Sequence, residues 1–74
     1  MARYVLTATD TLGGELGQRV SATAPTLAEI AEHGDLYDAC FVTVRRGSKT
    51  TLYERSYDGS WAVIETDEIG RAHV

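Results

Sequence analysis

The segment Ala39–Thr66 constrains the fold most, because it has the pattern of three consecutive β-strands joined by two tight turns. Gly47-Ser48 and Asp58-Gly59 are typical hairpin turns, and the second pair favours the positive φ angles that such turns need. Apolar and aromatic residues occupy both faces of the predicted strands. The sequence predicts one short helix, which can cover one face only. The other face is then expected to stay in contact with water.

Two-residue loops fix which residues share a face, because side chains alternate between the two faces of a strand. In this register Arg46 opposes Lys49 and Tyr57 opposes Ser60. The face that best suits the helix collects Cys40, Val42, Val44, Thr51, Tyr53, Arg55, Ala62 and Ile64. The opposite face collects Ala39, Phe41, Thr43, Arg45, Leu52, Glu54, Ser56, Trp61, Val63 and Glu65. A slip of one residue in either loop would reassign these sets.

The residues before Ala39 add two further strands. Tyr4–Thr9 is rich in β-branched and aromatic residues, and Gln18–Thr23 alternates apolar with polar residues. Turn-forming residues, Asp10 to Gly14, follow the first of these segments. The two segments are therefore expected to pair as a hairpin.

A short helix is predicted after this hairpin. Thr26 and Glu29 have the spacing of a capping box, which begins a helix, and Gly34 is expected to end it. Leu27 and Ile30 fall at helical spacing and are expected to face the sheet. Glu29, Glu32 and His33 are expected to face outward.

The elements follow the order β-β-α-β-β-β, which predicts an α+β fold with a mainly antiparallel five-stranded sheet and one short helix. A small curled β-barrel with a helix is the alternative. Residues 1–66 are expected to form a single compact domain, and residues 67–74 a C-terminal tail that frays or makes a short turn near Ile69. The last three predicted strands span Ala39–Arg46, Lys49–Tyr57 and Ser60–Thr66.

Charge and cysteine content argue against several classes of protein. The net charge of -4 disfavours general binding to nucleic-acid phosphates. Cys40 is the single cysteine, which excludes an internal disulfide, and the separation of His33 from His73 disfavours zinc. No cofactor is predicted. A free cysteine, no export signal and no long apolar run predict a cytoplasmic protein without membrane contact.

Catalytic groups do not form a recognisable set. His33, Asp35 and Asp38 lie close in sequence, but no nucleophile, base and orienting group can be assembled from them. The glycines from Gly13 to Gly17 do not match a phosphate-binding fingerprint. The sequence therefore predicts a protein that is not an enzyme.

A surface that binds protein is the leading functional prediction. The face left uncovered by the helix would carry Phe41, Leu52, Trp61 and Val63, with Tyr57 nearby. Exposed aromatic residues in an apolar patch are typical of protein interfaces. Small domains also gain stability by association. We therefore expect a non-catalytic protein-binding module that contacts another protein or forms a homodimer.

A small nucleic-acid-binding domain is the alternative. Arg45, Arg46, Lys49 and Arg55 form the main basic concentration and could contact phosphates around the hairpin tip. Pairing with acidic residues on neighbouring strands explains the same residues without any ligand. Nucleic acid is therefore the less favoured partner.

In its general style, the short, acidic and motif-free chain resembles small bacteriophage proteins that bind a host protein. This resemblance implies a viral inhibitor or modulator of a host protein. It involves no particular residues, so it assigns no site.

Overall fold

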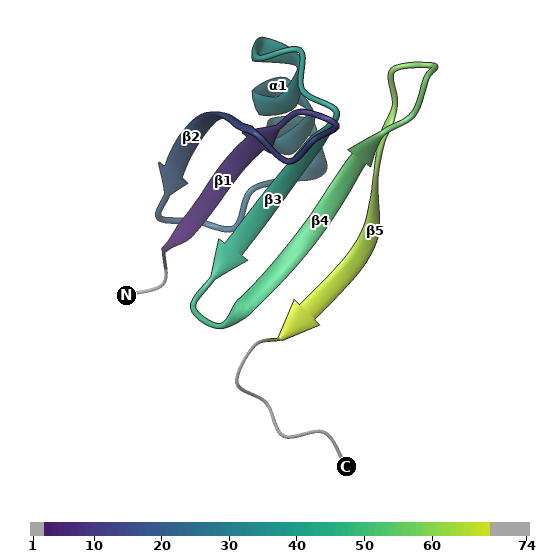
Figure 1. Cartoon of the computed structure of the whole chain (residues 1–74). Coiled ribbons are helices and arrows are strands. Elements are labelled where there is room, and N and C mark those ends of the chain that lie inside the picture. Colours follow the sequence, from purple (N-terminus) through teal and green to yellow (C-terminus); the bar gives the residue numbers. More distant parts are fainter. Residues whose placement is uncertain (1–2, 69–74) are drawn as a thin grey trace.

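The computed structural model describes residues 3–68, which form one open antiparallel sheet and one helix (Figure 1). The five strands lie in the order β2-β1-β3-β4-β5. The predicted α+β fold and element order are confirmed, and the closed barrel is wrong. The elements are β1 (Tyr4–Thr9), β2 (Glu15–Ser21), α1 (Leu27–Leu36), β3 (Phe41–Arg46), β4 (Lys49–Arg55) and β5 (Trp61–Glu68).

Helix α1 covers one face of the sheet because it connects two strands that are not neighbours. β2 and β3 lie on either side of β1 and are both antiparallel to it, so they run parallel to each other. A parallel connection needs a crossover, and α1 provides it by passing over β1 (Figure 1). The helix packs on β1, β3 and β5.

We call the covered side the helix face and the opposite side the outer face. The strand registers assign the residues of each. The helix face includes Leu6, Ala8, Val42, Val44, Tyr53, Arg55, Trp61 and Val63. The outer face includes Val5, Thr7, Thr9, Glu15, Gln18, Val20, Phe41, Thr43, Arg45, Thr50, Leu52, Glu54, Ala62 and Glu65.

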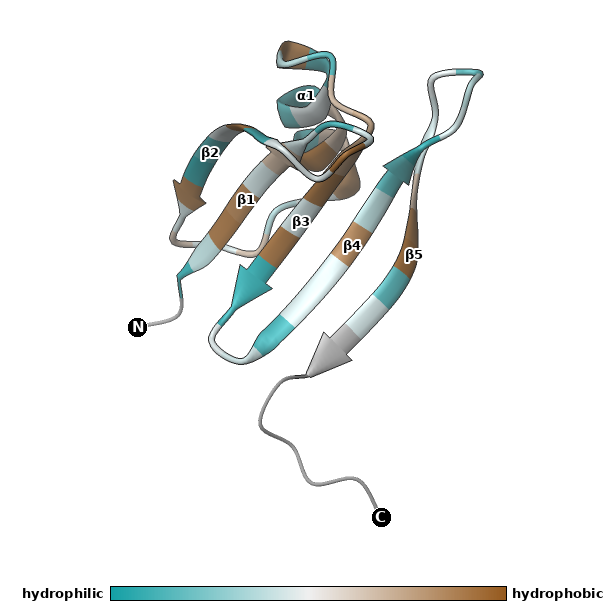
Figure 2. Cartoon of the chain, in the orientation of Figure 1, coloured by the Kyte–Doolittle hydropathy of each residue, from teal (hydrophilic) through white to brown (hydrophobic). Residues whose placement is uncertain are grey.

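The hydrophobic core lies between α1 and the helix face. Figure 2 shows apolar residues along β1 and β3, the two central strands on which α1 packs. Leu6, Ile30 and Val42 are the largest fully buried side chains. The core cluster consists of Leu6, Ala8, Ile30, Ala39, Val42, Val44 and Trp61.

The capping box begins α1 as predicted. The Thr26 hydroxyl accepts from the Glu29 N–H at 3.2 Å, and the Glu29 carboxylate accepts from the Thr26 N–H at 2.9 Å. The predicted stop at Gly34 is wrong, because α1 continues to Leu36. Gly34 lies buried inside the helix, against the ring of Trp61. Because glycine has no side chain, the Trp61 ring can pack closely against the helix at this position.

Two predicted helix orientations are also wrong. His33 is 4% exposed and packs inward, whereas Leu27 is 50% exposed. Ile30 is buried as expected. The inward face of α1 therefore consists of Ile30, His33 and Gly34, because residues three and four positions after Ile30 lie on the same side of a helix.

Several strand limits differ from the prediction. β2 begins three residues earlier than predicted, at Glu15, and ends at Ser21. β4 ends at Arg55, and β5 runs from Trp61 to Glu68, past the predicted limit at Thr66. The predicted turn near Ile69 and the rest of the tail, residues 69–74, lie outside the described residues.

The loop between β4 and β5 has three residues where two were predicted. Ser56 pairs with Ser60, since the Ser56 N–H donates to the Ser60 carbonyl at 2.7 Å, and Gly59 has a φ of 93°. A three-residue hairpin loop of this kind places glycine in the left-handed region. Asp58 closes the loop by accepting from the backbone and hydroxyl of Ser60 at 3.0 and 2.7 Å. These bonds lower the pKa of the Asp58 carboxyl below its ordinary value.

This extra loop residue moves the start of β5 to the other register. Trp61 opposes Arg55 and Val63 opposes Tyr53, so both lie on the helix face and their predicted position on the uncovered face is wrong. Ala62 moves to the outer face for the same reason, opposite Glu54.

A β-bulge then cancels the slip. Tyr53 opposes Val63 but Leu52 opposes Glu65, which leaves Ile64 as the extra residue of β5. Beyond the bulge the register is the predicted one. At the other hairpin, Arg46 opposes Lys49, as predicted for the two-residue turn.

Candidate protein-interaction face

The outer face is ordered in three rows that cross the strands. The middle row contains Gln18, Thr7, Thr43, Leu52 and Glu65. The row nearer the β3–β4 turn contains Val20, Val5, Arg45, Thr50 and Asp67. The row nearer the β4–β5 loop contains Glu15, Thr9, Phe41, Glu54 and Ala62.

The centre of the outer face is apolar without being covered. Phe41 and Leu52 are half-buried and Val20 is 54% exposed, although the only helix within residues 3–68 lies on the opposite face. The partial burial of Phe41 and Leu52 comes from their neighbours on adjacent strands. A shallow depression of about 430 Å³ lies beside them and is lined by Arg3, Val5, Thr7, Gln18, Val20, Thr43, Arg45 and Thr50.

Charges of opposite sign lie at the two ends of the outer face. Arg3 and Arg45 lie toward the β3–β4 turn, where Asp67 opposes Thr50 in the same row, and Glu15 and Glu54 lie toward the β4–β5 loop. Within the part of the chain that the structure describes, Arg45 and Glu54 make no ion pair. Charged groups of both signs therefore lie around the apolar centre of the outer face.

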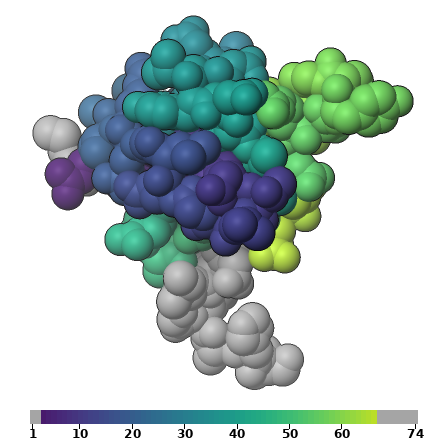
Figure 3. Space-filling model, turned by 45° about the horizontal axis from the view of Figure 1, so that its top comes forward, coloured from purple at the N-terminus to yellow at the C-terminus, as the bar shows by residue number. Residues whose placement is uncertain are grey.

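The predicted binding residues do not form one surface. Phe41 and Leu52 lie on the outer face, but Trp61 is 6% exposed and belongs to the core. Val63 is exposed on the helix face. Tyr57 lies fully exposed in the β4–β5 loop, which projects from the body of the molecule (Figure 3). The register slip separates the two aromatic residues of the predicted patch from each other.

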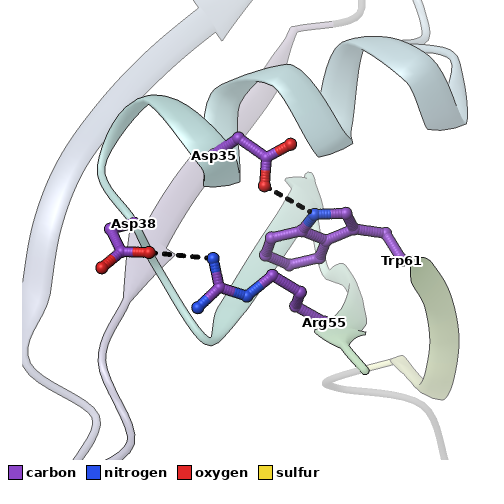
Figure 4. Close-up of polar contacts among 4 residues, drawn as sticks. All are labelled: Asp35, Asp38, Arg55 and Trp61. Atoms are coloured by element: carbon purple, nitrogen blue, oxygen red, sulfur yellow. Dashed lines mark hydrogen bonds and ion pairs between the residues drawn. The ribbon is translucent and has the colours of Figure 1, made fainter. Parts of the chain in front are cut away.

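Trp61 is held in the core from two sides. Its indole Nε1–H donates to Oδ1 of Asp35 at 3.2 Å (Figure 4). Its ring also lies against Gly34. Beside it, Arg55 donates to Oδ1 of Asp38 at 3.0 Å. This hydrogen bond raises the pKa of Arg55 above its ordinary value. Both contacts join the end of α1 to the β4–β5 hairpin.

The three acid–base candidates have separate partners. His33 Nε2 lies 3.4 Å from the Gly17 carbonyl oxygen, and the His33 ring meets Tyr37 edge-on with centroids 5.2 Å apart. Asp35 accepts from Trp61, and Asp38 binds Arg55. An open hollow of about 710 Å³ contains His33 and Asp35 in its lining, but not Asp38.

Among the side chains of residues 3–66, no three His, Cys, Asp or Glu groups are placed to hold a metal ion. The structure thus gives His33, Asp35 and Asp38 separate partners, and it does not bring them together around one point.

The four basic residues also lie apart. Arg45 is on the outer face, whereas Arg46 and Lys49 line a hollow on the helix side, where Arg46 stacks over Tyr4 at 5.6 Å. Arg55 lies at the far end of β4 and is paired with Asp38. The structure therefore does not bring them to a common phosphate-binding surface.

Residues of β1 and β2 complete the outer face and were missed by the sequence reasoning. Val5, Thr7 and Val20 lie beside Thr43 and Arg45 because β1 pairs with β3. The alternation of Val5 and Thr7 with buried Leu6 signals a face, but the sequence did not predict the strand order.

Comparison with models of known protein families, with curated proteins and with solved structures found no match. Among residues 3–68, no helix has the length and apolar character of a membrane span.

Proposed function

We propose that this chain is a non-catalytic protein-binding module that acts through its outer face. One observation carries the proposal: Phe41, Leu52, Val5 and Val20 lie together on a sheet face over which no described element packs. Association removes such apolar surface from water, which is the main favourable term in protein binding.

The arrangement of residue types also favours a protein partner. Protein interfaces have an apolar centre and a polar rim. On the outer face Leu52 and Phe41 are central, while Arg45, Glu54 and Glu15 lie toward the ends. The charged residues would fix the orientation of the partner, because wrong orientations bring like charges together.

Site-specific photo-crosslinking tests this function in cells that express the chain. One variant carries p-benzoylphenylalanine in place of Leu52. The matched control carries it in place of Val63, which is exposed but lies on the helix face. We expect light-induced protein adducts from position 52 and few from position 63. Adducts to a second copy of the chain support the function. Adducts to another protein, such as a protein of a cell that a virus infects, support it as well.

The proposal fails if position 52 gives no protein adduct, or if both positions give the same adducts in equal amount. Circular dichroism of both variants verifies that the fold is retained. Each adduct partner is then purified and its binding to the unmodified chain is measured by calorimetry.

A further inference from the structure

The charges at the ends of the outer face are arranged so that the face complements itself. Arg45 and Phe41 lie at equal distances on either side of Thr43 in β3, and Glu54 opposes Phe41 from β4. Turning a second copy end over end therefore brings a basic end onto an acidic end. No partner of another kind is needed to explain this pattern.

We propose that the partner of the outer face is a second copy of this chain, bound face to face with its strands running in opposite directions. This inference rests on the proposed function, since it concerns the same surface. The two copies are related by a two-fold axis that crosses the strands along the middle row, through Thr43 and Leu52. Such an interface is isologous, which is the commonest form of association between identical chains.

The strand register determines which residues meet. Residues of the middle row meet their own copies, so Leu52 faces Leu52 and Thr43 faces Thr43. Arg45 lies over the partner's Phe41, with the partner's Glu54 on the adjacent strand. An arginine between an aromatic ring and a carboxylate gains a cation–π contact and an ion pair together.

The other face-to-face orientation is disfavoured by charge. A two-fold axis along the strands would place Arg45 near Arg45 and Glu54 near Glu54. Like charges brought together in an interface cost several kcal/mol. In the favoured orientation Glu65 of the middle row meets its own copy, but this like-charge pair lies on the edge strand β5, where water reaches both carboxylates.

The size of the face sets the expected strength. Five strands about 4.8 Å apart and about six residues long give a footprint of roughly 450 Å² on each copy. Stable interfaces bury about 800 Å² on each partner, so this dimer is expected to be weak and to depend on concentration. Dissociation in roughly the micromolar range is consistent with this area.

Charge reversal within the chain tests the inference. Arg45→Glu places two carboxylates at the contact between position 45 and the partner's position 54, and Glu54→Arg places two guanidinium groups at the same contact. Each variant should repel itself, which weakens its dimer about tenfold or more. The two variants mixed should attract each other at both ends. The double variant, Arg45→Glu with Glu54→Arg, should recover the dimer because opposite charges again meet between position 45 and the partner's position 54.

Analytical ultracentrifugation over a concentration series measures these dissociation constants. Arg46→Glu is the matched control, since Arg46 neighbours Arg45 in sequence but lies on the helix side, and it should leave the dimer unchanged. A wild-type chain that stays monomeric at every concentration overturns the inference. A mixture or a double variant that associates no better than the single variants also overturns it.

The outcomes for the two proposals are distinguishable. A monomeric chain that crosslinks from position 52 to another protein refutes the second copy and leaves the proposed function in place. A chain that neither self-associates nor crosslinks from position 52 refutes both.

Discussion

Replacing Gly34 by alanine tests whether Trp61 is locked against α1. A methyl group at this position would lie 2.3 Å from Cζ2 and 2.4 Å from Cη2 of Trp61. It would also lie 3.0 Å from Cγ2 of Val42. These atoms belong to a buried ring and a core side chain, so neither group moves aside without disturbing its own packing.

Two effects of opposite sign determine the result. In an exposed helix, glycine to alanine stabilises by about 1 kcal/mol. Overpacking a core costs about 1–3 kcal/mol, and moving the indole would also weaken its bond to Asp35, worth about 1 kcal/mol. We expect a net loss of about 1–2 kcal/mol for Gly34→Ala. This is a large fraction of the roughly 4–11 kcal/mol that a chain of this length is expected to have.

Urea unfolding followed by far-UV circular dichroism measures the change. The same substitution in a Trp61→Phe background is the control, because phenylalanine lacks the two ring atoms that a methyl at Gly34 would approach most closely. There we expect Gly34→Ala to be nearly neutral or stabilising, with a coupling energy of about 1–3 kcal/mol between the two positions. If Gly34→Ala stabilises both backgrounds equally, Trp61 does not pack as described and its assignment to the core is refuted.

Three further predictions concern α1. Thr26→Ala should lower the free energy of unfolding by about 1 kcal/mol through loss of the cap, and Thr26→Ser should restore most of it, as measured in urea. The pKa of Glu29 is lowered from its ordinary value of 4.5, first by a backbone hydrogen bond from Thr26. The contribution of ionised Glu29 to the free energy of unfolding is therefore complete above pH 4.5 and is lost as the pH falls through the lower folded-state pKa. Glu29→Gln should therefore make the free energy of unfolding less dependent on pH in the acidic range. Asp35→Ala should cost about 1 kcal/mol by freeing the Trp61 N–H, whereas Asp35→Asn keeps an acceptor; equal losses for both would contradict this.

Local chemistry made much of the fold predictable from the sequence. The capping box at Thr26 and Glu29 needs only four residues, so it is confirmed with both of its hydrogen bonds. The turn at Gly47-Ser48 likewise gives the pairing of Arg46 with Lys49. β-Branched and aromatic residues predicted the strand at Tyr4–Thr9, and alternation of apolar with polar residues predicted the strand at Gln18–Thr23.

The faces of β5 were not predictable in the same way. Both a two-residue and a three-residue loop suit Asp58-Gly59, and the difference of one residue carries Trp61 from one face to the other. Gly34 was ambiguous for a similar reason, since a glycine can end a helix or admit a ring beside it.

The sequence by itself determined that five strands and one short helix form, since turns, caps and alternation depend on residues near each other in the chain. Only the tertiary structure decided that the large indole fills the core and that residues of β1 and β2 lie beside Phe41 and Leu52 on the outer face. Those choices depend on which strands lie side by side and on a bulge, and packing between distant segments sets both.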